Sequence, residues 1–206
     1  MTNAGPARPL WLRLLLVPVS WGLVAVGVSM LIRADIGVAP YDVLNTGIAE
    51  TLDIDIATAF LVDAIVLYLV GWALGGRLGW ASVAGTFVIS PMIDVLLDRW
   101  DEIDALAVRV PLFGVGLLVL CGSVGLAVLT ELGPGPTEVF MLGLVARGAP
   151  VARARWATDG LVLGIGTLLG GAIGPGTLVF LIAFGPMVAR CLRILRYTPP
   201  ARFVEV

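Results

Sequence analysis

The sequence predicts an all-α integral membrane protein with six transmembrane helices, arranged as two inverted three-helix repeats that each contain a short half-helix. Three observations support this prediction: the composition, six long apolar runs and an internal duplication. Of the 206 residues, 59% are apolar and 14% are charged, whereas charged residues make up about 25% of a soluble domain. Such a surface has too few polar groups to face water, so we expect the lipid bilayer to cover it.

The residue types also argue against several classes of function. The chain has no His, and Cys121 and Cys191 both lie in apolar runs, which argues against His-based catalysis, a disulfide framework and a metal centre. The Gly-rich segment 75–79 lacks the Lys-Ser/Thr of a phosphate loop. All 13 basic residues are Arg, with no basic cluster among aromatics. We expect no enzymatic activity, no cofactor and no nucleic-acid partner.

Six apolar runs are long enough to span a membrane, because a spanning helix needs about 20 residues. The runs are 10–32, 57–75, 79–98, 107–130, 155–173 and 174–193. Gly-rich or Gly-Pro turns separate the second run from the third and the fifth from the sixth, which predicts tight hairpins. The resulting segments are a tail at 1–9, a first repeat at 10–98, a loop at 99–106, a second repeat at 107–193 and a tail at 194–206.

The arginines predict the orientation, since positively charged loops tend to remain in the cytoplasm. With the N-terminus inside, ten arginines are cytoplasmic: Arg8, Arg13, Arg77, Arg147, Arg153, Arg155, Arg190, Arg193, Arg196 and Arg202. The opposite orientation would reverse that count. The outer loops are then acidic, with Asp35, Asp42, Glu50, Asp53, Asp55, Asp98, Asp101, Glu102 and Asp104. We therefore expect both termini in the cytoplasm.

The second half of the chain repeats the first. A shift of 96 residues aligns Arg13 with Arg109, Gly37 with Gly133, Pro40 with Pro136, Val43 with Val139, Gly47 with Gly143 and Asp63 with Asp159. The same shift pairs Asp35 with Glu131 and Asp42 with Glu138, and a shift of 95 aligns Gly71, Gly75, Gly76 and Gly79 with Gly166, Gly170, Gly171 and Gly174. Because each copy has three spans, the second copy enters the membrane upside down. Inverted repeats are frequent in transporters and channels, although a duplication can also produce only a stable bundle.

Each copy contains a short helix that begins at a proline, at about 40–50 and 136–146. Proline suits a first helical turn, and Asp42 and Glu138 then face the positive end of the helix dipole. Eleven residues extend about 16 Å, roughly half of the hydrocarbon core, so neither helix can span. Each is re-entrant or interfacial, and the apolar second copy favours the re-entrant position. The alternative for both acids is that they only satisfy their own helix ends.

Two further acids, Asp63 and Asp159, lie inside predicted spans at matched positions. An ionised Asp costs about 3 kcal/mol in the hydrocarbon, so it needs a cavity, a partner or a proton. One interpretation is a protonatable or cation-coordinating pair. The alternatives are a hydrogen bond between helices or, for Asp159, snorkelling beside Arg155. The Gly71-x-x-x-Gly75 spacing and its copy at 166–170 predict close helix packing.

Several motifs resemble a known family. Gly-Val-Ala-Pro-Tyr-Asp-Val-Leu at 37–44, the Gly-rich hairpin after the second run and Ser-Pro-Met-Ile-Asp at 90–94 are similar to the YczE-like (YczE/YyaS/YitT) family of bacterial inner-membrane proteins. In the second half, Thr137 and Glu138 replace the aromatic residue and the Asp. The resemblance covers most of the chain and implies a multi-pass protein of the bacterial plasma (inner) membrane. It does not supply a substrate.

We expect a transporter or channel for a small solute or ion, proton- or cation-coupled, with its site at the interface of the repeats. The expected site residues are Pro40, Asp42, Asp63, Pro136, Glu138 and Asp159. The alternative is a membrane subunit that captures a small molecule for a separate complex or supports its assembly. A homodimer is compatible with either function, since no residue decides the oligomeric state.

The predicted orientation can be tested with compartment-sensitive reporters fused after Trp100 and at the C-terminus. We expect the two fusions to report opposite compartments, with the C-terminal one in the cytoplasm, because ten of the arginines then stay inside. A shared compartment would overturn both the topology and the inverted repeat.

Overall fold

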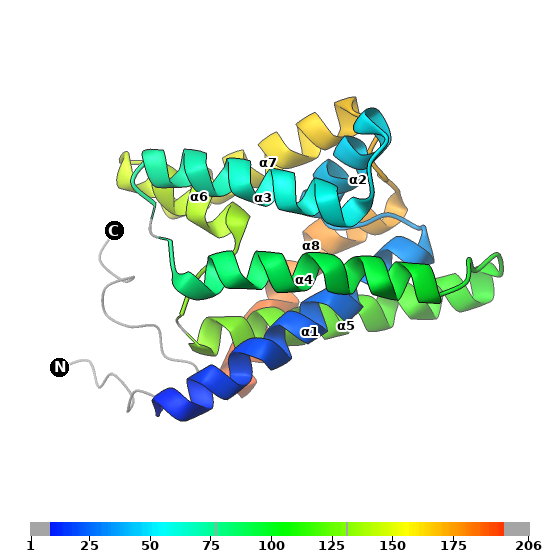
Figure 1. The fold of residues 1–206 in the computed structure, drawn as a ribbon, viewed down its shortest axis with the longest axis horizontal. Coiled ribbons are helices and arrows are strands. Elements are labelled where there is room, and N and C mark those ends of the chain that lie inside the picture. The colour runs from blue at the N-terminus through cyan, green and yellow to red at the C-terminus, as the bar shows by residue number, and fades with distance from the viewer. Residues whose placement is uncertain (1–8, 77, 131, 196–206) are drawn as a thin grey trace.

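The computed structural model describes residues 9–76, 78–130 and 132–195, and all regular structure in this part of the chain is helical. The helices are α1 (Leu10–Ala34), α2 (Pro40–Leu52), α3 (Ile56–Ala73), α4 (Trp80–Arg99), α5 (Leu106–Thr130), α6 (Pro136–Ala146), α7 (Val151–Leu168) and α8 (Pro175–Ile194). Most of them run along the longest dimension of the molecule (Figure 1). Most of both predicted tails, together with Arg77 and Glu131, lies outside the described residues.

Each predicted apolar run and each predicted short segment forms a helix, but the bounds of α7 differ from the prediction. The expected run was 155–173, whereas α7 begins at Val151, directly after Pro150, and ends at Leu168. It ends early because Gly170 has a φ of 82°, a left-handed turn that glycine adopts without a steric penalty. Gly75 has a φ of 100° and terminates α3 in the same way.

Helix length and composition indicate a membrane-embedded protein. Five helices in the described residues, α1, α3, α4, α5 and α8, are long and apolar enough to cross a membrane. The 18-residue α7 carries Arg153, Arg155 and Asp159 and does not meet that criterion. At 13 and 11 residues, α2 and α6 extend only about 20 and 16 Å, short of a hydrocarbon core of about 30 Å. Large apolar side chains such as Ile182 are exposed on the outer faces, as lipid contact requires.

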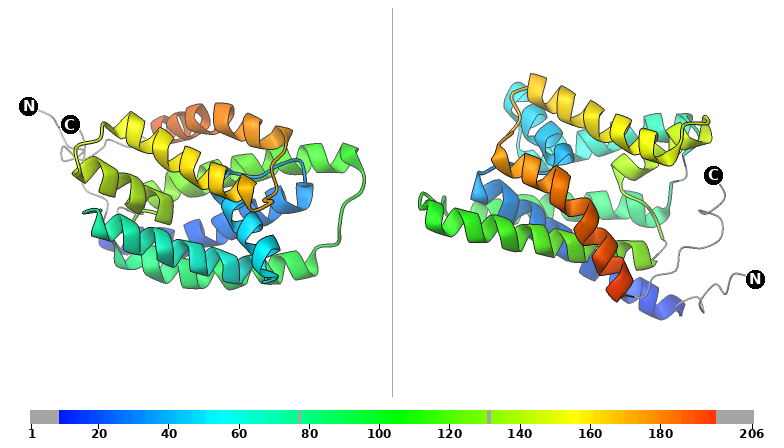
Figure 2. Two further views of the ribbon diagram at one scale, coloured as in Figure 1. Left: turned by 90° about the horizontal axis from the view of Figure 1, so that it is seen from above. Right: turned by 180° about the vertical axis from the view of Figure 1, so that it is seen from behind.

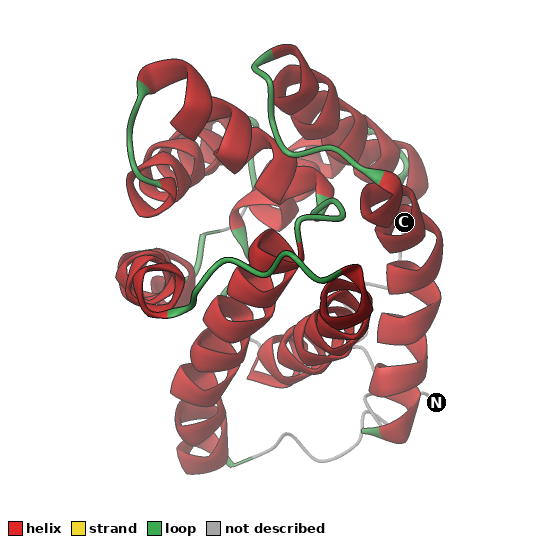
Figure 3. Ribbon diagram, turned by 90° about the vertical axis from the view of Figure 1, so that its right-hand side faces the viewer, coloured by secondary structure: helices red, strands yellow, loops and turns green. Residues whose placement is uncertain are grey.

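The helices pack in pairs that recur between the two halves of the chain. The two longest helices, α1 and α5, lie against each other, and Figure 3 shows the bundle from one end. The short helix of each half packs on the other half: α2 lies on α7, and α6 lies on α3. In addition, α1 packs on α4 as α5 packs on α8, and α2 packs on α3 as α6 packs on α7. The halves differ at α4, which packs on α3 more extensively than α8 packs on α7.

Matched arginines join α1 to α5 at both ends. The Arg13 Nε donates a hydrogen bond to the Thr130 carbonyl at 2.6 Å, and the Arg109 Nε donates one to the Ala34 carbonyl at 2.7 Å. Each guanidinium therefore meets the negative C-terminal end of the helix from the other half. Arg109 also forms an ion pair with Asp35 at 2.6 Å.

Matched glycines allow the short helices to approach the long ones at backbone distance. A Cβ added at Gly71 in α3 would lie 2.7 Å from the Phe140 nitrogen of α6, and one at Gly166 in α7 would lie 2.5 Å from the Leu44 nitrogen of α2. Both distances are too short for any side chain. The prediction of close packing is confirmed for these two glycines, whereas Gly75 and Gly170 form the helix-ending turns instead.

The short helices occupy opposite ends of the layer formed with α3 and α7, as the views in Figures 1 and 2 show. Pro40 is buried and Glu50 is exposed, so α2 begins inside the molecule and ends at its surface. Leu44 of α2 and Phe140 of α6 share an apolar cluster with Leu67 and Val162. The beginning of α1 and the end of α8 lie at one end of the molecule, opposite the connection between α4 and α5 (Figure 2).

These contacts predict opposite effects for two glycines of α7. Gly166→Ala should destabilise the protein by about 1–3 kcal/mol, because the added methyl group collides with the α2 backbone. Gly164→Ala is the matched control: no atom lies within 4 Å of its added Cβ, and alanine favours a helix by up to about 1 kcal/mol. The thermal unfolding midpoints of the purified variants in detergent measure the difference. Equal midpoints for both variants would contradict the close approach.

Candidate functional site

A buried polar cluster lies where α2 meets α3. Helix α2 supplies Tyr41, Asp42 and Asn45, which share a face because residues three and four apart lie side by side. Helix α3 supplies Asp63. The exposed fractions of Asp42, Asn45 and Asp63 are 4%, 1% and 3%. The Tyr41 ring packs edge-on against Phe60, with the ring centroids 5.5 Å apart, which holds its hydroxyl beside α3.

The polar atoms of this cluster have unused hydrogen-bonding capacity. The Tyr41 hydroxyl, both amide atoms of Asn45 and the Asp63 Oδ2 have no partner within hydrogen-bonding geometry among the described residues. The nearest polar neighbours lie within the cluster: the Tyr41 hydroxyl is close to the Asp63 carboxylate and the Asn45 amide is close to the Asp42 carboxylate, but neither pair has the geometry of a full hydrogen bond. Because nearly all buried polar groups in proteins have partners, four such atoms on three neighbouring side chains mark a candidate binding site.

The two carboxylates of this cluster also have no counter-ion. None of the ion pairs formed within the described residues involves Asp42 or Asp63. Asp42 and Asp63 interact electrostatically, so they repel each other when both are ionised. No group of three or more His, Cys, Asp or Glu residues that could hold a metal ion exists in the described part of the chain.

The matched position in the second half holds a closed ion-pair network. Arg155 of α7 donates from Nη1 to the Glu138 Oε1 at 3.0 Å and from Nε to the Asp159 Oδ2 at 2.8 Å. The Thr137 hydroxyl donates to the Glu138 Oε2 at 3.1 Å. The side chains of Arg155 and Glu138 are 42% and 40% exposed, so this network is only partly buried. Arg155 is therefore the shared counter-ion of both acids in this network.

The structure therefore divides the six expected site residues into two clusters. Pro40 and Pro136 begin α2 and α6, as expected, and each stands directly before a cluster. Asp42 lies with Asp63, and Glu138 lies with Asp159. The two pairs belong to opposite halves, and no hydrogen bond or ion pair within the described residues joins Asp63 to Asp159.

Sequence reasoning missed three residues of these clusters. Tyr41 and Asn45 flank Asp42 on α2, and their helical spacing was the available signal. Arg155 was considered only as a neighbour of Asp159, not as the bridge to Glu138. The 96-residue shift would have shown the asymmetry, because it places Ala59, which is fully buried, opposite Arg155.

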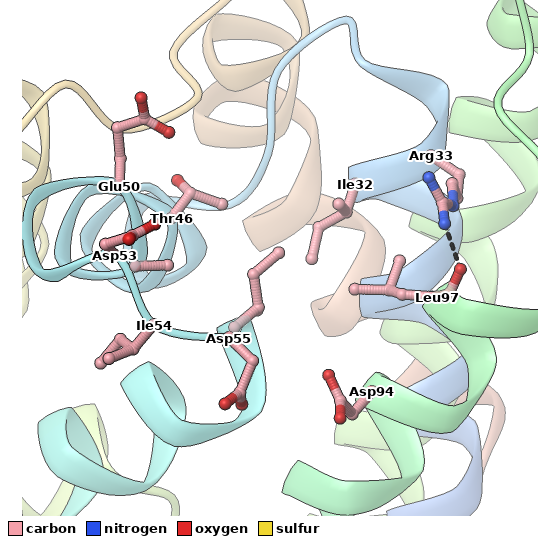
Figure 4. Close-up of a pocket in the computed structure, with 11 residues that line it drawn as sticks. Ile32, Arg33, Thr46, Glu50, Asp53, Ile54, Asp55, Asp94 and Leu97 are labelled. Atoms are coloured by element: carbon pink, nitrogen blue, oxygen red, sulfur yellow. Dashed lines mark hydrogen bonds between the residues drawn. The ribbon is translucent and has the colours of Figure 1, made fainter.

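An open pocket of about 540 Å³ lies at the end of the molecule where α2 ends and α3 begins. Figure 4 shows the carboxylates around it: Glu50, Asp53, Asp55 and Asp94. The only arginine in its lining is Arg33, whose Nη2 donates to the Leu97 carbonyl. Hydrogen bonds from the Thr58 backbone N–H and hydroxyl lower the pKa of Asp55, which keeps this carboxylate ionised. The pocket is therefore strongly acidic.

The ion-pair network predicts that Arg155→Ala destabilises the protein, because it leaves Glu138 and Asp159 without a cation. We expect a loss of about 1–2 kcal/mol, less than for a fully buried triad because the side chains are partly exposed. Adding Glu138→Gln to this variant should recover part of the loss. Arg153→Ala, an exposed neighbour on the same helix, is the control. Chemical unfolding in detergent measures all three, and an equal loss for both arginine variants would refute the bridging role.

Comparison with known proteins places the chain in a family. The model of the "Family of unknown function (DUF6198)" matches residues 11–193. An "Uncharacterized protein" of Haemophilus influenzae is 28% identical over 179 residues, which cover 86% of this chain and 82% of the relative. No solved structure matches the chain. Because the family match runs from the second residue of α1 to the penultimate residue of α8, the chain belongs to the DUF6198 family of unknown function.

Proposed function

We propose that this protein is a transporter or channel for a small solute or ion in the bacterial plasma membrane, with six spans arranged as two inverted repeats. Both termini then lie in the cytoplasm, as the distribution of arginines predicts. The resemblance to the YczE-like family supports the inner-membrane location. The buried, uncompensated pair Asp42 and Asp63 is the observation on which the function depends.

The reciprocal contacts support the inverted repeat. Exchange of the two halves converts the packing of α2 on α7 into that of α6 on α3, and the bond from Arg13 to Thr130 into that from Arg109 to Ala34. Reciprocity of this kind is what a twofold axis between two copies produces. With three spans in each copy, that axis lies in the membrane plane.

The sixth span is α7, which occupies the position in its half that α3 occupies in the first. Its charges are compatible with a span because Arg155 and Asp159 neutralise each other at 2.8 Å. Arg153 lies in the first turn, from which a long side chain reaches the headgroups. Packing of α2 on α7 and of α6 on α3 supports a re-entrant position for the short helices, because protein rather than lipid then covers the α2 backbone at Leu44 and the α6 backbone at Phe140.

The buried acids support a transport function because of their energetic cost. Each ionised carboxylate in the membrane interior costs about 3 kcal/mol unless it has a proton, a partner or a hydrated cavity. Asp42 and Asp63 have no arginine partner in the described residues and lie beside the beginning of a half-helix. Half-helix termini near the membrane midplane are the usual binding sites of secondary transporters. We propose that this pair couples transport to a proton or another cation, and that Glu138 and Asp159 form the opposite side of the interface.

The proposal predicts that Asp63→Asn abolishes transport and leaves folding intact. The amide preserves the shape and removes the charge, and its burial costs no more than that of the carboxylate. Proteoliposomes on a solid-supported membrane would be exposed to jumps of pH, Na⁺, K⁺, methylammonium, phosphate and amino acids. We expect a protein-dependent charge displacement for at least one of these jumps. In Asp63→Asn, the displacement should fall by at least about tenfold, which corresponds to the loss of an interaction worth about 1.4 kcal/mol or more.

Asp98→Asn is the matched control, because this exposed acid of α4 lies outside the buried cluster. It should retain the wild-type displacement. If wild-type protein gives no displacement for any jump and instead co-purifies with a separate membrane complex, the protein is an assembly or capture subunit and the transport proposal is wrong.

A further inference from the structure

We propose that Tyr41, Asp42, Asn45 and Asp63 form a binding site for a small monovalent cation, which enters through the acidic pocket at the end of α2. This inference rests on the proposed transport function and specifies its coupling ion or substrate class. The observations that support it are the unfilled hydrogen-bonding capacity of the cluster, its contrast with the second half, and the acidic pocket one helical turn away on the same face of α2.

The donor set of the cluster matches a cation. The Tyr41 hydroxyl, the Asn45 carbonyl and the two carboxylates offer oxygen ligands, which hard cations and ammonium groups prefer. The Asn45 side chain is 1% exposed, and neither of its amide atoms has a hydrogen-bond partner in the described residues. The only polar neighbour of this amide within the cluster is the Asp42 carboxylate, so a bound ligand would supply a partner that the amide otherwise lacks, and an unpaired buried polar group is costly.

The charge and the number of ligands favour a monovalent ion. Ca²⁺ takes 6–8 oxygen ligands, and Mg²⁺ retains several waters and demands octahedral geometry. The cluster has only two carboxylates, and no group of three or more His, Cys, Asp or Glu residues in the described part of the chain is placed to hold a metal ion. An anion is excluded because the first-turn carboxylate of Asp42 already occupies the positive end of α2.

In the second half, a permanent cation, the side chain of an arginine, lies between the two matched acids. There, the Arg155 guanidinium lies between Glu138 and Asp159 at 3.0 and 2.8 Å. The first half has Ala59 at the matched position, fully buried and without charge. The two acids of the second half therefore share the positive charge of an arginine, whereas the two matched acids of the first half have no such charge beside them in the described residues. A mobile cation supplies that charge in the first half.

The pocket and the cluster lie along one face of α2, although the buried cluster residues do not line the pocket. Thr46 and Ala49 line the pocket, whereas Asp42 and Asn45 lie one turn deeper on the same face. Four residues of helix extend about 6 Å, so the step from Thr46 to Asp42 is short. Glu50, Asp53, Asp55 and Asp94 raise the local concentration of cations at the entrance, since clefts lined by one sign of charge concentrate the opposite one.

The experiment measures binding without transport. Purified full-length protein in detergent is titrated with NaCl, KCl or methylammonium chloride, with N-methylglucamine chloride holding the ionic strength constant, and its thermal unfolding midpoint is followed. A ligand that binds only the folded state raises the midpoint in a saturable way. We expect saturable stabilisation by at least one monovalent cation and none by MgCl₂, CaCl₂ or sodium-free phosphate at the same ionic strength.

The variants distinguish this site from a general salt effect. Asp42→Asn and Asp63→Asn should each weaken the apparent affinity by at least about tenfold, since each removes a charged ligand. Asn45→Ser, which retains a smaller polar group, should weaken it to a lesser degree and serves if an acid variant fails to fold. Asp98→Asn is the control and should retain wild-type affinity, because this exposed acid of α4 lies outside the cluster and does not line the pocket.

Three outcomes would overturn the inference: no stabilisation of the wild type by any monovalent cation, stabilisation only by a divalent ion, or equal affinity in all variants. The proposed transport function fails separately. If no monovalent cation stabilises the protein but another solute still produces a charge displacement, only this site is rejected. If a cation stabilises the protein but no solute produces a charge displacement, transport is rejected and the protein is a cation-binding protein.

Discussion

Backbone contact between each short helix and a long helix of the other half is the constraint on which the rest of the structure depends. A helix of 11 or 13 residues cannot cross the bilayer, so an end that lies within the bilayer must be enclosed by protein. Gly71 and Gly166 make the enclosure possible, because any side chain there would collide with the opposing backbone. The same contacts place the beginning of α2 against α3 and the beginning of α6 against α7, where both acid clusters form.

The fold repeats closely, whereas the chemistry of its two clusters does not. Matched helix pairs, matched glycines and matched arginine bonds recur in both halves. One matched position changes the chemistry between the halves. Arg155 is the counter-ion of the acids in the second half, whereas Ala59, at the matched position, leaves the acids of the first half without a counter-ion in the described residues. Because Arg155 already supplies the positive charge in the second cluster, only the first of these two clusters is a candidate cation site.

The internal duplication explains why so much of the helix pattern was predictable. The helices of the described residues lie close to where apolar runs and proline starts place them, and Pro40 and Pro136 begin the short ones as expected. The prediction of where α7 ends is wrong because a glycine can serve either helix packing or a turn. Gly170 was assigned to helix packing, but its left-handed backbone ends α7 at Leu168, before the apolar run ends. Apolar composition alone does not distinguish a helix from the turn that follows it.

The sequence by itself determined the membrane class, the helix segmentation and the matched acids, because these follow from hydropathy, proline and glycine chemistry and the internal repeat, all of which are local or periodic. Only the tertiary structure decided which groups meet. The bridge from Arg155 to Glu138 joins different helices, and the unpartnered state of Asn45 depends on what α3 and its neighbours bring to α2. Both depend on side-chain positions set by packing between segments, which no single helix encodes.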